Sequence, residues 1–180
     1  MVDIFNVTLG ANKAMSSEHA ISVYTRENVP KGLRHTLALY HDETCRKKVK
    51  RAYTMGNIRG RKIDLYIVCM RKERRLRSDR AEDRVLGFLI AQERKHAMYL
   101  DVVCAVPGHG ARLIELFEEE ALRRGYAVAE LRSVPGAEGF WKKKGYRALP
   151  PTKACGPARE KKSGDAENGY RMSKCLAKGK

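Results

Sequence analysis

Two glycines stand between a strongly apolar segment and an amphipathic one. Met98 to Val106 is almost continuously apolar, which predicts a buried strand, and Pro107 ends it. After Gly108-His109-Gly110, the segment Ala111 to Arg124 has apolar residues at helical spacing, and Gly125 ends it. A strand that turns at glycines directly into a helix presents unpaired backbone amides at the positive end of the helix dipole. This arrangement predicts a site for a phosphate or pyrophosphate.

The predicted anion cradle consists of backbone amides on both sides of Pro107, which has no N–H. These are the amides of Val106, Gly108, His109, Gly110, Ala111 and Arg112. The alternative interpretation is a plain turn in which glycine permits tight packing, and this feature alone does not decide between the two. A further strand at Tyr126 to Val134 makes the unit βαβ, with a right-handed crossover and parallel strands.

A second motif lies beyond this unit. Ala137 to Tyr146 (AEGFWKKKGY) predicts a short helix ended by a glycine. Together, Gly108 to Leu113 and Ala137 to Tyr146 resemble the GNAT superfamily of acyl-CoA-dependent N-acetyltransferases: the first resembles the end of its pyrophosphate loop, the second its Ala-x-x-Phe-Tyr-x-x-x-Gly-Phe motif. The histone-acetyltransferase branch is nearest, because Phe140 to Lys143 and Cys104-Ala105-Val106 resemble pieces of it.

The sequence departs from that family's pattern at several positions. Ala105 stands where the family has Gln or Arg, the loop before the glycines is several residues short, and Val134 stands where many members have asparagine. Trp141 replaces the tyrosine that many members use to protonate the leaving thiolate. Indole is not an acid at neutral pH, so Trp141 either packs against the cofactor or fills the core, and core filling is favoured.

The resemblance implies roles for two residues of the first strand. The backbone amide of Cys104 would stabilise the oxyanion where the strand splays from its neighbour, whereas its buried thiol is expected to act as a small hydrophobe. The histone-acetyltransferase branch has a glutamate base just upstream of that cysteine, and Asp101 lies there one residue out of register. One residue turns a strand side chain to the other face unless a bulge intervenes, so a structural ion pair or hydrogen bond is the favoured alternative for Asp101. The ring of His109 either contacts the cofactor or is exposed.

The remaining chain predicts the frame around this unit. The expected fold class is α+β, with a mixed, mostly antiparallel sheet, a central βαβ unit and helices on both faces. One GNAT-like domain is expected over residues 1–180, with its core at about 21–150. The expected elements are a strand at Ile21 to Tyr24, a helix from Leu33 to Tyr40, a second helix from Glu43 to Tyr53, a hairpin of Ile63 to Met70 with Val85 to Glu93, and a closing strand at about 170–176.

The net charge of +16 is concentrated in two regions. Residues 46–80 hold 14 Lys or Arg and three Asp or Glu, a net charge of +11, and residues 151–180 carry +5, so the rest is neutral. The strand order places the basic run Arg71 to Arg80 at the same edge as Gly108. Such a field attracts a polyanion, either the cofactor or a nucleic acid, and the alternative is a solvated turn.

The five cysteines are odd in number, widely spaced and without a CxxC pair. This pattern argues against a zinc site and against a disulfide framework, and it predicts an intracellular, reducing compartment, either cytoplasm or nucleus. No apolar run approaches the length of a membrane span, and no secretory signal core is visible, so no membrane association is expected.

Two functional hypotheses follow. The leading one is an N-acetyltransferase that passes an acetyl group directly from acetyl-CoA, its co-substrate, to an amine acceptor, either a small molecule or a protein. The alternative is a GNAT-fold protein that has lost catalysis and binds nucleic acid or a ribonucleoprotein through residues 46–80. The acceptor is not readable: a basic surface disfavours histone tails and polyamines, but a local acidic groove could override the global charge.

Overall fold

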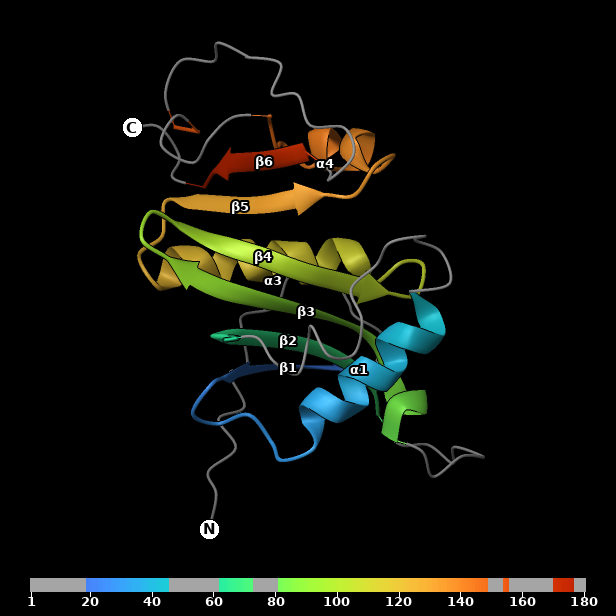
Figure 1. Cartoon of the computed structure of the whole chain (residues 1–180). Helices are drawn as coiled ribbons and strands as arrows, with labels where there is room; N and C mark the ends of the chain where they lie inside the picture. The colour runs from blue at the N-terminus through green and yellow to red at the C-terminus, as the bar shows by residue number, and fades with distance from the viewer. Residues whose placement is uncertain (1–18, 46–61, 73–80, 149–153, 156–169, 177–180) are drawn as a thin grey trace.

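One six-stranded sheet organises the part of the chain that the computed structural model describes, residues 19–45, 62–72, 81–148, 154–155 and 170–176. The strands follow chain order across the sheet, and all neighbours are antiparallel except β4 and β5 (Figure 1). The predicted α+β class with a central βαβ unit is therefore confirmed. The strands are β1 (His19–Thr25), β2 (Leu65–Arg71), β3 (Val85–Arg94), β4 (Ala97–Ala105), β5 (Val128–Ser133) and β6 (Tyr170–Cys175).

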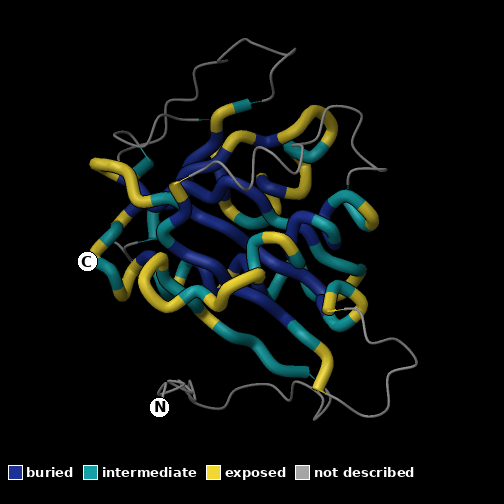
Figure 2. Tube along the Cα trace, turned by 60° about the horizontal axis from the view of Figure 1, so that its bottom comes forward, coloured by how far each residue is buried: buried dark blue, intermediate teal, exposed yellow. Residues whose placement is uncertain are grey.

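Helices cover both faces of the sheet, as predicted. The helix α1 (Leu33–Thr44) packs on one face through Leu37 and Tyr40, and α3 (Gly110–Arg123) packs on the other through Leu113 and Phe117. Alternate strand residues belong to the two cores, as the period of two requires, and the dark interior of Figure 2 follows these strands. The short helices are α4 (Glu138–Lys143) and η2 (Ala81–Arg84).

Most predicted elements lie within two residues of the observed ones, but the second predicted helix does not. It was expected from Glu43, whereas α1 continues to Thr44, and the remainder, from 46 on, lies outside the described residues. The single domain over residues 1–180 includes further undescribed ranges and stays a prediction. None of the described helices is long and apolar enough to cross a membrane.

Two disulfide bonds correct the interpretation of the cysteines. Cys45 bonds to Cys104, with Cα atoms 6.1 Å apart, and Cys155 bonds to Cys175, with Cα atoms 4.8 Å apart. Cys69 is free and buried. The prediction from the number and spacing of the cysteines was wrong, because the bonded cysteines are 59 and 20 residues apart in sequence and meet only in the fold. The reducing compartment stays a prediction, but cysteine usage no longer supports it, since disulfides persist mainly in oxidising surroundings.

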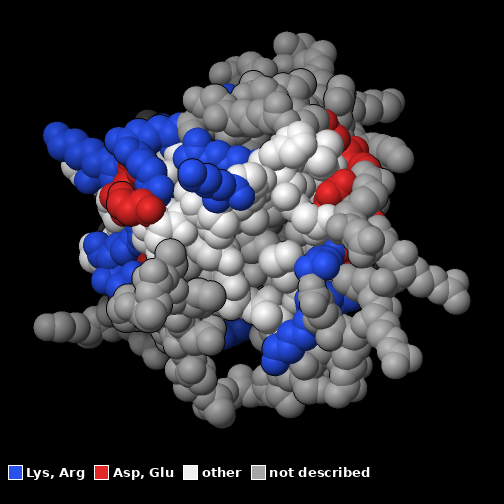
Figure 3. Space-filling model, turned by 90° about the horizontal axis from the view of Figure 1, so that it is seen from below, with Lys and Arg blue, Asp and Glu red and all other residues white. Residues whose placement is uncertain are grey.

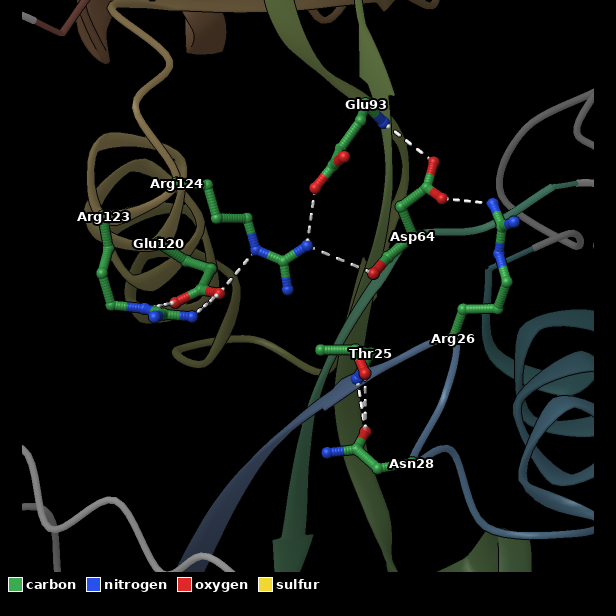
Figure 4. Close-up of polar contacts among 8 residues, drawn as sticks. All are labelled: Thr25, Arg26, Asn28, Asp64, Glu93, Glu120, Arg123 and Arg124. Carbon is green, nitrogen blue, oxygen red and sulfur yellow. Dashed lines mark hydrogen bonds and ion pairs between the residues drawn. The ribbon is translucent and has the colours of Figure 1, made fainter.

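A network of ion pairs fixes the C-terminal end of α3 against the sheet (Figure 4). Arg124 pairs with Glu120 at 2.7 Å and with Glu93 of β3 at 2.8 Å, and its guanidinium also donates to the Asp64 carbonyl. The Asp64 carboxylate in turn accepts from the Glu93 amide at 3.0 Å and pairs with Arg26. These contacts orient α3 along the strands, so that its N-terminus lies beside the C-terminal end of β4.

Acid should weaken this anchor through Glu120. Burial opposes ionisation of this carboxyl, but hydrogen bonds from Arg123 and Arg124 outweigh burial and lower its pKa. A depressed pKa contributes stability that is present above the unfolded value, about 4.3, and is lost as the pH falls through the folded value. We expect Glu120→Gln to lower the free energy of unfolding by about 1 to 3 kcal/mol at pH 7. The deficit should shrink below pH 4.

Urea unfolding at several pH values measures this difference. Glu119→Gln is the matched control on the same helix, because the Glu119 side chain is 52% exposed and its pair with Arg112 should contribute little. A Glu120→Gln deficit that persists unchanged at pH 3 would contradict the assignment.

The disulfides predict a simple labelling pattern. In the unreduced, denatured protein an alkylating agent should modify Cys69 alone, and after reduction it should modify all five cysteines. Mass spectrometry counts the labels. Closing loops of these lengths stabilises a fold by about 3 to 4 kcal/mol in the chain-entropy view, so reduction should also lower the Tm. Five labels without reduction would show that the bonds do not form.

Candidate active site

The site begins where two parallel strands separate. β4 and β5 pair from Met98 opposite Ala129 to Leu100 opposite Leu131. Both strands continue beyond this point, β4 to Ala105 and β5 to Ser133, with no further pairing between them. Past Leu100, the β5-facing backbone groups of β4 are therefore turned toward an opening.

Asp101 lies at the vertex of this opening, on a β-bulge. Leu100 pairs with Ala91 and Val102 with Ile90, so Asp101 is an extra residue in β4. The residue is 7% exposed, and its carboxylate accepts a hydrogen bond of 3.1 Å from the Gln92 side chain. Gln92 is two residues from Ile90, which packs in the core under α1, so both Gln92 and Asp101 face the α1 side. The bulge supplies the shift that the sequence comparison required, while the hydrogen bond to Gln92 matches the structural alternative.

The ladder with β3 determines which amides of β4 face the opening. The Val106 N–H donates to the Leu86 carbonyl at 2.9 Å, and hydrogen-bonded positions recur at every second residue. The amide of Cys104 is therefore directed toward β3, and those of Val103 and Ala105 toward the opening. A Cβ on Gly87, opposite Ala105, would come within 2.6 Å of the Ala105 Cβ, which agrees with a close, non-hydrogen-bonded pair at that position. The amide of Cys104, which the resemblance implied as the oxyanion donor, thus faces away from the opening.

The Cys104 side chain points to the α1 side and is 2% exposed. Its sulfur is bonded to Cys45, directly after α1, so it is not a free buried thiol as the sequence predicted. A sulfur in a disulfide carries no thiolate, so Cys104 is not available as a nucleophile.

The glycine loop has the geometry expected of an anion cradle. Gly108 has a φ of 92°, and a Cβ there would meet no atom within 4 Å, so the backbone borders open space. In α3 the Leu113 N–H donates to the His109 carbonyl. The amides of Gly110, Ala111 and Arg112 come before it, in the first turn, where an N–H has no partner within the helix. Two predicted donors are engaged elsewhere: the Val106 N–H with Leu86, and the His109 N–H with the Val106 carbonyl at 3.3 Å. The cradle therefore narrows to the amides of Gly108, Gly110, Ala111 and Arg112.

Comparison of the whole structure with solved proteins identifies the fold. A putative N-acetyltransferase from Lactobacillus plantarum matches with a TM-score of 0.59 and 21% identity, over 89% of this chain and 99% of that one. The catalytic domain of Tetrahymena GCN5 histone acetyltransferase in complex with coenzyme A matches at 0.56 and 15%, over 91% and 96%. The Escherichia coli ribosomal-protein-S18-alanine N-acetyltransferase matches at 0.54 and 11%, over 89% and 97%. No family model and no curated protein matches the sequence.

The chain has the GNAT fold. The resemblance inferred from the two sequence motifs is thereby confirmed at the level of fold. In this GNAT fold, the separating ends of β4 and β5 and the glycine loop lie together at one end of the βαβ unit, as the motif comparison implied.

Trp141 lies in the core of this GNAT fold. Its side chain is 6% exposed and contacts Phe140 and Tyr146 edge-on, with ring centroids 5.0 and 5.3 Å away. This position agrees with the core-filling interpretation, and contact with a cofactor stays a prediction. Burial and the nearby Glu118 raise the pKa of Tyr146 well above its usual value, so this phenol stays protonated at neutral pH.

Imidazole rings and one arginine flank the glycine loop. The His109 ring lies edge-on to His19 of β1, with centroids 5.0 Å apart, and His19 pairs with Arg71 across β1 and β2. Burial lowers the pKa of His109, and the charges of His19 and Arg71 lower it further, so the ring is neutral at pH 7. Arg112 pairs with Glu115 and Glu119 of its own helix, at 3.4 and 3.3 Å. Arg112 is therefore engaged by carboxylates of its own helix. The positive charge of Arg71, by contrast, acts on the loop, as its effect on the pKa of His109 shows.

Arg71 and Lys72 also place the start of the predicted basic run at this edge, while residues 73–80 and 46–61 lie outside the described residues. From the side of β1, the described Lys and Arg side chains form separate groups around an uncharged area (Figure 3). The strand β1 itself has no Lys, Arg, Asp or Glu. Nucleic-acid binding through residues 46–80 therefore stays a prediction.

A second buried carboxylate went unnoticed in the sequence. Glu130 of β5 is 2% exposed, lies opposite Tyr99 and pairs with Arg171 of β6 and, at 3.7 Å, with Arg94 of β3. The Arg94 guanidinium also stacks on the Tyr99 ring, 3.4 Å from its centroid. A lone acidic residue between Ala129 and Leu131 was the available signal. Among the described residues, His, Cys, Asp and Glu form no group of three that could hold a metal ion.

The glycine loop can be tested with an isosteric pair of variants. Gly108→Asp and Gly108→Asn impose similar backbone strain at positive φ, but only the aspartate places a negative charge beside the amides. We expect Gly108→Asp to bind coenzyme A at least tenfold more weakly than Gly108→Asn, because like charges repel at this distance. Calorimetric titration measures both, and thermal unfolding checks the fold. Equal affinities would contradict a phosphate site, and Gly110→Asp repeats the test in the first turn of α3.

Proposed function

We propose that the chain is an acetyl-CoA-dependent N-acetyltransferase that transfers the acetyl group directly to an amine. The observation that carries the proposal is the separation of β4 and β5 at Leu100, which leaves backbone donors, a buried carboxylate and a glycine loop around one opening. Fold alone supports many functions, so the argument depends on these groups.

The chain's own residues fit acetyl-CoA in two places. The amides of Gly108, Gly110, Ala111 and Arg112 would hold the pyrophosphate, and the open space at Gly108 leaves room for it. The amides of Val103 and Ala105 face the opening and would donate to the thioester carbonyl oxygen as negative charge develops there. Acetyl-CoA supplies the activated acetyl group.

Asp101 would accept the proton that the amine nitrogen loses as it bonds to the carbonyl carbon and the carbon–sulfur bond breaks. The leaving group is a thiolate. Because thiols are weak acids whose pKa lies only slightly above neutrality for cysteine, about 8.5, a thiolate can depart without an acid poised beside it. Trp141 therefore need not replace the missing tyrosine in function. The proton passes to Asp101 and from there to solvent.

Binding and thiol release test the proposed function directly. Acetyl-CoA should bind in calorimetry with a micromolar dissociation constant, and thiol release should rise when a panel of amines is added, comprising lysine-bearing peptides, free peptide N-termini and small diamines. Absence of acetyl-CoA binding would overturn the proposal. The catalytically inactive alternative predicts instead steeply salt-dependent binding of nucleic acid.

Replacing Asp101 tests its proposed role as base. Asp101→Asn should lower kcat at least tenfold near pH 7 with little change in acetyl-CoA affinity, because the amide cannot take the proton. Raising the pH should partly restore turnover, since more of the acceptor amine is then already deprotonated. Glu130→Gln is the matched control: it removes a buried carboxylate one strand away and should lower stability more than kcat. A normal kcat with a lowered Tm in Asp101→Asn would make Asp101 structural.

A further inference from the structure

Gln92 approaches the proposed base from the neighbouring strand. Its side-chain amide donates to Oδ2 of Asp101 at 3.1 Å. Gln92 pairs with Tyr99 across β3 and β4, so it stands beside the last regular part of β4 before the bulge. Its side chain is partly exposed, whereas the carboxylate that it contacts is almost fully buried.

The bulge gives this contact its importance. A regular strand residue has an opposite residue that fixes its backbone and limits its side chain, but an extra residue has none. Asp101 has lost that support on the β3 side, and pairing with β5 ends at the preceding residue, Leu100. The hydrogen bond from Gln92 connects the carboxylate to β3, the strand that continues to hold β4.

The chemical type of the donor distinguishes the two buried carboxylates. Glu130 is paired with the guanidinium groups of Arg171 and Arg94, so a proton on Glu130 would disrupt ion pairs in a buried setting. Asp101 receives a hydrogen bond from the neutral amide of Gln92, which orients the carboxylate. Because Gln92 is neutral, proton uptake by Asp101 breaks no ion pair with Gln92.

We propose that Gln92 is a positioning residue for the acetyl transfer: its amide holds the Asp101 carboxylate at the vertex of the opening between β4 and β5. This inference rests on the proposed function. Gln92 acts through Asp101 and touches neither substrate, so its loss should affect turnover only while Asp101 is present.

A double-mutant cycle tests the inference. Gln92→Met keeps the length of the side chain and removes the donor, and it should lower kcat about tenfold, as expected for a misplaced catalytic group, with unchanged acetyl-CoA affinity. In the Asp101→Asn background the same change should lower kcat no further. The pH dependence of kcat in Gln92→Met should also differ from that of the parent, whereas the double variant should have the same pH dependence as Asp101→Asn.

Arg94→Met is the control for loosening of β3. Arg94 lies two residues further along the same strand and contacts Tyr99 and Glu130, so kcat should stay within about twofold of the parent. Three results would each overturn the inference: a parent-like kcat in Gln92→Met, a further additive loss in the Asp101→Asn background, or an equal loss in Arg94→Met.

The proposed function is tested separately in the parent protein. A parent that binds no acetyl-CoA, or releases no thiol with any amine of the panel, fails before any variant is made, and the inference fails with it. A parent that turns over while Gln92→Met behaves like it overturns only the role of Gln92.

Discussion

The last residues of β4 are held on one side only. They remain in the ladder with β3, but pairing with β5 stops at Leu100, although both strands continue. A buried strand that loses one ladder must satisfy its free amides in another way or leave them for a ligand. This requirement explains why the features of the candidate site gather along five residues of β4.

Several contacts compensate for the missing neighbour. Gly87 lets β3 approach Ala105 more closely than any other residue type would, and the Val106 N–H extends the ladder beyond the strand. The disulfide between Cys45 and Cys104 joins the same segment to the end of α1. On the opposite face, α3 is tied down at its far end by Arg124, which leaves its N-terminal amides directed at the glycine loop. These contacts hold the end of β4 on the sides that face β3, α1 and α3, and leave only the side that faces β5 without support.

The local features of this arrangement could be predicted from the sequence, and the long-range ones could not. Periodicity and the glycine turn predicted β4, α3 and the loop between them, because these depend on neighbouring residues. The bulge at Asp101 depends on pairing with β3, and the disulfides depend on distances between segments far apart in sequence. The engagement of the Val106 amide likewise required knowing that Leu86 lies opposite. The sequence therefore predicted β4 and the glycine loop as elements, whereas the fold was needed to tell which of their amides are already engaged.

The alternation of a strand then gives the separated part of β4 distinct functions on distinct sides. Val102 and Cys104 direct their side chains to α1 and their amides to β3, so they anchor the segment. Val103 and Ala105 pack their side chains toward α3 and turn their amides to the opening, so they are the ones able to meet a ligand. Asp101 escapes this alternation because it is the extra residue of a bulge, which lets a carboxylate face the α1 side immediately before the amides begin to face the opening. In a regular strand Asp101, which precedes Val102, would face the α3 side, so the bulge is what brings its carboxylate to the α1 side next to the amides that face the opening.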